Sequence, residues 1–223
     1  MNTDEKKNNV RNLHNAMAVQ YSTEFFNDDS DHDIFINFLN NLNGKKVLDA
    51  GCGDGKDVKF LLEQGFDPIG VDFTEEFLKI AGEKVPNGKF KLGDITDLSS
   101  FDDDSFDGIM AIYSLQHLPA EQLDQTLSGF RRILKPDGQL LIALQTGTLG
   151  EQLKDEPFLP GQKLYINFVS REQMEDLLTS NGFETTMFLQ AEEPSKDAIG
   201  DGKLFFQASN KKLDLAGITR FHR

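Results

Sequence analysis

The segment Val47-Leu48-Asp49-Ala50-Gly51-Cys52-Gly53-Asp54-Gly55 carries the strongest structural signal in the chain. Its first residues predict a short buried strand that ends near a carboxylate, and Gly51, Gly53 and Gly55 predict a tight turn after it. An amphipathic helix is expected next, over residues 57–64. Because glycine has no side chain, the backbone of such a turn can approach a bound ligand closely. The segment therefore predicts a ligand site between the first strand and the first helix of an α/β domain.

The alternation of strand and helix patterns continues beyond that segment. From Lys46 onward, short apolar runs alternate with amphipathic stretches that end in Gly or Pro, which is typical of repeated βα units. We therefore expect a doubly wound, Rossmann-like α/β fold, with a mostly parallel sheet and helices on both faces. Residues 135–138 are predicted to turn the chain before the fifth strand. Strands are predicted at 47–50, 68–72, 89–92, 106–113, 139–145, 183–189 and 203–208, and helices at 57–64, after Thr74, at 120–134 and at 170–181.

The pattern also predicts how the chain is divided. Residues 1–45 are polar with apolar positions at helical spacings, which predicts an N-terminal helical cap. Residues 46–210 form the main domain. Within it, the segment 146–168 is too long for a routine connection, and we expect it to be a lid. The basic residues 211–223 are expected to be a loosely attached tail.

Composition limits the partners and the compartment. A formal net charge of −14 and a pI near 4.6 surround the protein with a negative field, which repels nucleic-acid phosphates and anionic lipids. Cys52 has no second cysteine for a disulfide or a metal pair. The first residues lack the apolar core of a signal peptide, and no long apolar run predicts a membrane span. We expect a cytoplasmic protein that acts on small molecules, without nucleic acid or membrane partners.

Two residues argue that the glycine turn binds something other than a dinucleotide. The dinucleotide fingerprint requires Gly or Ala three positions after its second glycine, where this chain has Lys56. A carboxylate such as Asp49, about 4 Å from a phosphate, would cost about 4 kcal/mol at an effective dielectric constant of 20. A nicotinamide-dependent oxidoreductase is therefore disfavoured. S-adenosylmethionine carries an ammonium and a sulfonium and no phosphate, and we predict it as the cofactor.

Further carboxylates are expected beside the turn. Asp72 closes the second predicted strand, where a carboxylate can accept hydrogen bonds from both ribose hydroxyls, and Asp94 closes the third. The carboxyl ends of parallel strands meet at one edge of the sheet, so Asp49, Asp72, Asp94 and the segment after Ile112 are predicted to line one crevice.

The ordered motifs resemble those of the class I S-adenosylmethionine-dependent methyltransferases over about 46–208. The motifs that carry the resemblance are 47–55, Val71-Asp72, Gly93-Asp94-Ile95, Phe106-Asp107-Gly108-Ile109 and Leu134-Lys135-Pro136-Asp137-Gly138. The resemblance implies a seven-stranded sheet whose last strand is antiparallel. It also implies that Gly51 and Gly53 lie under the methionine part, Asp72 on the ribose, Phe73 and Asp94 on the adenine, and Ala111 and Ile112 at the amino-acid end. The predicted cofactor-binding set is Asp49, Ala50, Gly51, Gly53, Asp72, Phe73, Asp94, Ile95, Ala111 and Ile112.

The acceptor is less well defined by sequence. The fourth strand runs into Ala111-Ile112-Tyr113-Ser114, which is not the Asn- or Asp-Pro-Pro-aromatic motif of adenine-amino methyltransferases, and no metal-ligand cluster stands out. We expect methyl transfer to an oxygen or nitrogen of a small molecule. The alternatives are a protein side chain as acceptor, or a regulatory or partner protein that binds the cofactor without transferase activity.

Each residue that could contact the methyl acceptor also has a second interpretation. His117 is a candidate general base, but it can equally cap or pack. Tyr21, with Phe25 and Phe26, either closes over the cofactor or belongs to the core. Tyr165, in the expected lid, is the third candidate. The small side chain of Cys52 is explained by the space available inside the turn, not by catalysis.

Overall fold

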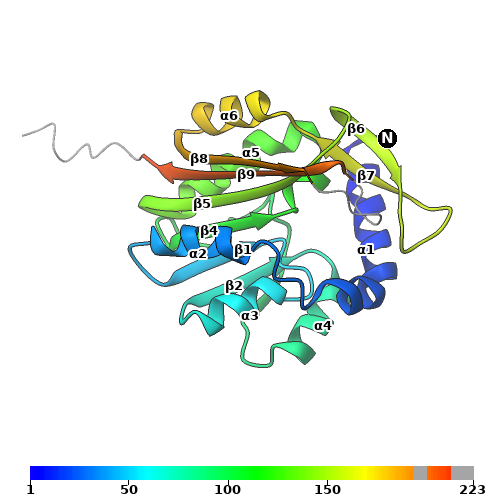
Figure 1. The fold of residues 1–223 in the computed structure, drawn as a ribbon, viewed down its shortest axis with the longest axis horizontal. Helices are drawn as coiled ribbons and strands as arrows, with labels where there is room; N and C mark the ends of the chain where they lie inside the picture. The colour runs from blue at the N-terminus through cyan, green and yellow to red at the C-terminus, as the bar shows by residue number, and fades with distance from the viewer. Residues whose placement is uncertain (193–199, 212–223) are drawn as a thin grey trace, which may run out of the picture.

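A computed structural model shows an α/β fold and describes residues 1–192 and 200–211. Its main sheet has seven strands in the order β3-β2-β1-β4-β5-β9-β8, and β9 runs antiparallel to both of its neighbours (Figure 1). The predicted seven-stranded sheet with an antiparallel last strand is thereby confirmed. The strands are β1 (Lys46–Ala50), β2 (Asp67–Asp72), β3 (Phe90–Leu92), β4 (Phe106–Ile112), β5 (Leu134–Thr146), β8 (Phe183–Glu192) and β9 (Gly202–Asn210).

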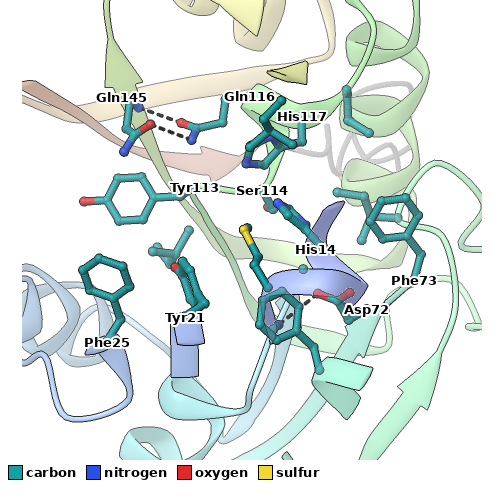
Figure 2. A pocket seen from close by; sticks show the side chains of 18 of the residues that line it. His14, Tyr21, Phe25, Asp72, Phe73, Tyr113, Ser114, Gln116, His117 and Gln145 are labelled. Carbon is teal, nitrogen blue, oxygen red and sulfur yellow. Dashed lines mark hydrogen bonds between the residues drawn. The ribbon is translucent and has the colours of Figure 1, made fainter. Parts of the chain in front are cut away.

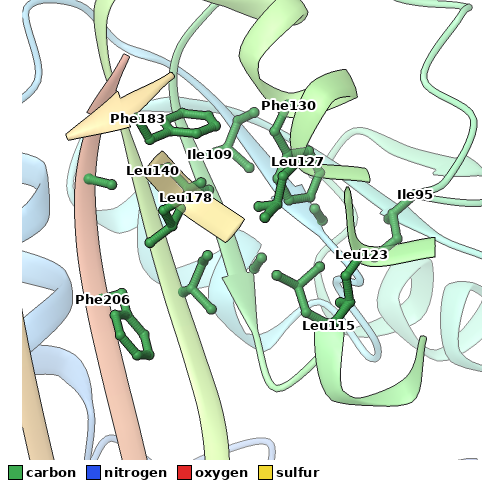
Figure 3. Packing of buried hydrophobic residues seen from close by; sticks show 14 of the residues in the cluster. Ile95, Ile109, Leu115, Leu123, Leu127, Phe130, Leu140, Leu178, Phe183 and Phe206 are labelled. Atoms are coloured by element: carbon green, nitrogen blue, oxygen red, sulfur yellow. The ribbon is translucent and has the colours of Figure 1, made fainter. Parts of the chain in front are cut away.

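Helices cover both faces of the sheet, as the apolar runs of its central strands require. The larger core joins one face to α5 (Ala120–Ile133) and α6 (Arg171–Ser180), through fully buried residues such as Leu127, Phe130 and Leu178 (Figure 3). The second core joins the other face to α2 (His32–Asn40) and α3 (Lys56–Glu63). The helix α4 (Glu75–Lys84) packs beside β2 and β3. The helix α6 begins with a capping box, in which Ser170 and Gln173 bond each other's backbone N–H.

The segment 146–168 is a β-hairpin with short connections. Its strands β6 (Gly150–Asp155) and β7 (Lys163–Phe168) form a separate antiparallel sheet. The N-terminal helix α1 (Thr3–Phe25) packs on this hairpin (Figure 1). Asn9 donates to the Lys163 carbonyl at 3.0 Å and accepts from the Tyr165 N–H at 2.7 Å. The N-terminal helix α1 and the β6–β7 hairpin are thus bound to each other.

Two further predictions concern the turn before the fifth strand and the C-terminal tail. The turn predicted at residues 135–138 is instead an irregularity within β5, where Asp137 adopts a φ of 61° and the pairing jumps from Phe106–Leu134 to Gly108–Gln139. Of the predicted tail, residues 212–223 lie outside the described residues. Within the described part of the chain, no helix is long and apolar enough to cross a membrane.

Candidate active site

The glycine turn is held rigidly against β2. Gly51 and Gly53 have φ values of 88° and 50°, in the left-handed region that favours glycine. The Gly51 N–H donates to the Val71 carbonyl at 2.8 Å, and the Gly53 N–H donates to Asp72 Oδ2 at 2.9 Å. The turn therefore keeps its shape through bonds to the neighbouring strand, independently of any ligand.

The two glycines differ in what surrounds them. A methyl group on Gly51 would lie 2.4 Å from Ser114 Cβ, so the absence of a side chain there allows the β4 loop to pack on the turn. A methyl group on Gly53 would meet no atom within 4 Å, and Gly53 lines a cavity. Gly53 leaves open a space that a side chain would fill, as expected beside a ligand.

A cavity of about 250 Å³ lies over the carboxyl ends of the strands, between α1, the β6–β7 hairpin and the turn. Figure 2 shows Asp72 and Phe73 on one side of it and Tyr21, Phe25 and Tyr113 on the other. The sequence-predicted residues in its wall are Gly51, Gly53, Asp72, Phe73, Asp94, Ile95, Ile112, Tyr21 and His117. Most of the predicted set is thus brought together around one space.

Asp72 is fixed at the cavity by backbone donors. Its Oδ1 accepts from the Thr74 N–H at 2.8 Å and its Oδ2 from the Gly53 N–H at 2.9 Å. Only 7% of the residue is exposed, and this burial raises its pKa in spite of those bonds. A carboxylate oxygen can accept two hydrogen bonds, so each oxygen keeps acceptor capacity for a hydroxyl of a ligand.

Asp94 is bound to the N-terminal helix. It forms a salt bridge with Lys7 of α1, and its Oδ1 accepts from the N–H and the hydroxyl of Thr96 at 2.9 and 2.7 Å. Burial acts to raise the pKa of Asp94, but these partners outweigh it and the pKa is lowered. Asp94 therefore stays charged and ties α1 to the edge of the cavity.

Three residues of the predicted cofactor set do not line the cavity: Asp49, Ala50 and Ala111. All are almost completely buried, because β1 and β4 are central strands that helices cover on both faces. Asp49 is 1% exposed, and its Oδ2 has no hydrogen-bond partner within residues 1–192 and 200–211. Burial, and then the charges of Asp57 and Asp72, raise its pKa well above the usual value. Asp49 therefore lies behind the turn and does not contribute to the surface of the cavity.

The end of β4 is strained where it enters the site. Tyr113 has a φ of 55°, which is unfavourable for a side chain of this size. Its N–H donates to the Ala143 carbonyl at 2.9 Å and its hydroxyl to Asp31 Oδ2 at 2.7 Å, so both ends are held. The bend turns the chain so that Ser114 packs on Gly51 and both Tyr113 and Ser114 line the cavity.

A pair of histidines lies in the cavity wall. The rings of His14, from α1, and His117 are 4.9 Å apart in an edge-to-face contact. Burial lowers the pKa of His117 to about 4, and burial together with His117 lowers that of His14. His117 Nδ1 lies 3.3 Å from the Tyr165 carbonyl, which only accepts, so the proton of the neutral ring is on Nδ1 and Nε2 is an acceptor. The geometry leaves His117 able to accept a proton while also packing.

The other residues expected to contact the methyl acceptor fall into two groups, those that line the cavity and those that do not. Tyr21 and Phe25 lie in the wall and contact Phe158 of the hairpin, with ring centroids 6.2 and 5.9 Å apart. Tyr165 does not line the cavity: it is 2% exposed and packs between α1 and the hairpin. Phe26 lies outside as well, with Lys84 over its ring at 4.0 Å.

Several wall residues were not singled out from the sequence. On α1, Lys7, His14 and Met17 lie in the wall together with Tyr21 and Phe25, and their helical spacing is the signal that would have found them as one face. Gln116 and Gln145 brace each other through two hydrogen bonds, of 2.8 and 3.2 Å (Figure 2). The hairpin contributes Glu156, Pro157 and Phe158. Pro157 and Phe158 belong to the segment that was expected to be a lid, whereas no local pattern marks Gln116, Gln145 or Glu156 as wall residues.

The arrangement fits S-adenosylmethionine on chemical grounds. Gly53 provides space, Asp72 provides acceptors for hydroxyls, and the carboxylates at the strand ends favour a cationic ligand over a phosphate. Gly51, Gly53, Asp72, Phe73, Asp94 and Ile95 are the residues that would hold it. Among the described residues, no group of three or more His, Cys, Asp or Glu side chains could hold a metal ion.

Comparison with known proteins agrees with this geometry. A family model described as a methyltransferase domain matches residues 47–138. The chain is 37% identical over 117 residues to the methyltransferase GfsG of Streptomyces halstedii, covering 48% of this chain and 41% of that protein. It is 35% identical over 133 residues to a demethylmenaquinone methyltransferase of Staphylococcus carnosus, covering 56% and 52%. The chain thus spans about half the length of these curated relatives.

Solved structures extend the likeness to nearly the whole fold. A 1,6-didemethyltoxoflavin-N1-methyltransferase from Burkholderia thailandensis superposes with a TM-score of 0.73 at 22% identity, over 95% of this chain and 92% of the other. An S-adenosylmethionine-dependent methyltransferase from Methanosarcina mazei gives 0.71 at 21% identity, over 80% and 97%. The fold and the site are of the kind found in α/β domains that transfer methyl groups. Residues 47–138 match a methyltransferase domain, and the fold is that of the S-adenosylmethionine-dependent methyltransferase from Methanosarcina mazei.

Proposed function

We propose that this protein transfers the methyl group of S-adenosylmethionine to an oxygen or nitrogen of a small-molecule acceptor. The observation that carries the proposal is a cavity in which Gly53 and Asp72 face the aromatic residues of α1 and the hairpin. A cavity with a polar wall on one side and an aromatic wall on the other suits a polar cofactor beside an apolar methyl acceptor. The toxoflavin-precursor methyltransferase with a similar fold acts on a small heterocycle, which supports this class of acceptor.

The residues of the chain would act mainly by positioning. When bound, the cofactor would supply an activated methyl group that a nucleophile on the acceptor could attack in line, with S-adenosylhomocysteine as the leaving group. Asp72 and the glycine turn would orient the cofactor, while Tyr21 and Phe25 would exclude water and hold the methyl acceptor beside it. His117, neutral at pH 7, can take a proton from an acceptor hydroxyl or amine within its reach. A strong base is needed only where that proton must leave early.

The proposal is tested by measuring binding and transfer separately. S-adenosylhomocysteine and NAD are titrated by calorimetry, and transfer of a labelled methyl group is screened against metabolite pools. Asp72→Ala should weaken cofactor binding by about 1–3 kcal/mol, the range for loss of a charged hydrogen-bond partner. Asp67→Ala, at the exposed opposite end of β2, is the matched control and should bind normally. Binding of NAD in preference to S-adenosylhomocysteine would contradict the proposal.

Binding of the cofactor without transfer to any pool would instead support a cofactor-binding regulatory protein. The fold also occurs in the [4+2]-cyclase SpnF, which superposes with a TM-score of 0.63 at 17% identity. Measuring cofactor binding and methyl transfer separately distinguishes a methyltransferase from a protein that binds the cofactor without transferring its methyl group.

A further inference from the structure

Glu156 differs from every other carboxylate in the cavity wall. It follows β6 directly and is only 3% exposed. Its Oε1 accepts from the Phe158 N–H at 3.1 Å, whereas its Oε2 has no hydrogen-bond partner in the described part of the chain. Burial raises its pKa. A buried carboxylate oxygen without a donor is costly, so such an oxygen beside a cavity points to a donor on a ligand.

The fold does not need this oxygen. The connection after β6 is already closed by backbone bonds, from the Glu156 N–H to the Gln162 carbonyl at 3.0 Å and from the Leu159 N–H to the Glu156 carbonyl at 3.2 Å. The bond from Phe158 to Oε1 adds a third. The remaining oxygen therefore contributes a desolvation cost to the unliganded protein and no bond in return.

The cations in the wall are bound to other groups. Lys7 pairs with Asp94, and Lys56 Nζ lies 3.7 Å from Asp57 Oδ1. Lys203 Nζ lies 3.1 Å from Asp31 Oδ1. Burial and the Phe158 N–H are what shift the pKa of Glu156, and no cation of the described residues contributes. Glu156 thus has no cationic partner among the described residues, and its ionised carboxylate would repel anionic acceptors and favour a hydrogen-bond donor.

The surroundings of Glu156 are aromatic. Phe158, two residues away, contacts the rings of both Tyr21 and Phe25, and the charge of Glu156 contributes to the raised pKa of Tyr21 after burial and three aspartates. These three rings and Glu156 line the same cavity as the cofactor residues. Flat apolar surface beside one acceptor oxygen suits an aromatic ring that bears a single donor.

We propose that Glu156 binds the methyl acceptor, by accepting a hydrogen bond from an N–H or O–H group on a flat aromatic ring that lies against Tyr21, Phe25 and Phe158. This inference rests on the proposed function, because it places the acceptor beside the cofactor site. It makes Glu156 a specificity-determining residue for neutral or cationic aromatic donors.

The test uses two pairs of small aromatic probes, and the two members of each pair differ in one N–H or O–H donor. The pairs are benzimidazole with N-methylbenzimidazole, and 2-naphthol with 2-methoxynaphthalene. Dissociation constants are measured by ligand-observed NMR on the whole protein with saturating S-adenosylhomocysteine. In the unmodified protein, one donor probe should bind at least about tenfold more tightly than its methylated partner, the usual effect of losing a hydrogen bond to a charged group. The pair that discriminates identifies the donor as N–H or O–H.

Glu156→Met removes the acceptor oxygen and should bring that ratio close to one. Glu156→Gln, which removes the charge but keeps an oxygen for the Phe158 N–H, should raise the Tm by about 2–4 °C. Its NH2 group would replace Oε2 with a donor, so its ratio should also be close to one or lower. Asp155→Asn, at the neighbouring exposed residue, is the control and should leave the ratio unchanged.

Two results would overturn the inference: the same ratio in Glu156→Met as in the unmodified protein, or no donor preference in either pair at millimolar probe. A lower Tm for Glu156→Gln would assign the residue to folding. Failure of the proposed function is recognised separately, because the unmodified protein would then not bind S-adenosylhomocysteine.

Discussion

Replacing Gly53 with alanine should separate ligand binding from folding. The new methyl group meets no protein atom within 4 Å, so the folded protein accepts it at the cost of the left-handed φ of 50°. That strain is about 1–2 kcal/mol for an L-residue. In the complex the methyl group would occupy space that the cofactor needs, and overpacking of this kind typically costs about 1–3 kcal/mol. Cofactor affinity should therefore fall by about 5- to 150-fold.

Gly65→Ala is the matched control for Gly53→Ala. Gly65 lies just after α3 with a φ of 76°, and it does not line the cavity. A methyl group added there would also meet no atom within 4 Å. Thermal unfolding should show a similar loss of stability in both variants, while calorimetry with S-adenosylhomocysteine should show weaker binding only in Gly53→Ala. Equal cofactor affinity in the two variants would refute the placement of the cofactor over Gly53.

Two further variants test the walls of the cavity. Lys7→Met removes the partner of Asp94 and should cost about 1–2 kcal/mol in the free energy of unfolding, with faster hydrogen exchange in α1; Lys59→Met, which breaks an exposed pair, should cost less than about 0.5 kcal/mol. His117→Gln should flatten the pH dependence of unfolding. Between pH 4 and 6.5 the unfolded chain binds a proton at His117 that the folded chain does not, so stability rises with pH by about 3 kcal/mol relative to the variant. Identical slopes from denaturant titrations would contradict the lowered pKa.

The sheet and one side of the site could be predicted because their determinants are local. A strand that ends at Asp72 or Asp94 has its carboxyl end at the same edge as the glycine turn, wherever the helices pack. Asp49 illustrates the limit of this reasoning. It also ends a strand, but β1 is central and covered on both faces, so its side chain is buried behind the turn.

The opposite side of the site depends on contacts that no local pattern specifies. The helical face of His14, Met17 and Tyr21 was readable as a stripe, but the sequence does not say that this stripe faces the cofactor edge. Glu156 enters the wall only because 146–168 folds as a hairpin whose turn reaches α1. Tyr165 is buried for the same reason, since β7 places it against α1.

The bonds between α1 and β7 also constrain the order in which the protein can assemble during synthesis. Asn9 is translated 156 residues before Tyr165, the residue whose N–H it accepts. At about 5–20 residues per second, the ribosome needs about 8–30 s to cover that distance. During this interval the apolar stripe of α1 has no hairpin to cover it and is open to chaperones or to misassembly. The wall of the cavity that α1 and the hairpin share therefore cannot form until Tyr165 has been synthesised.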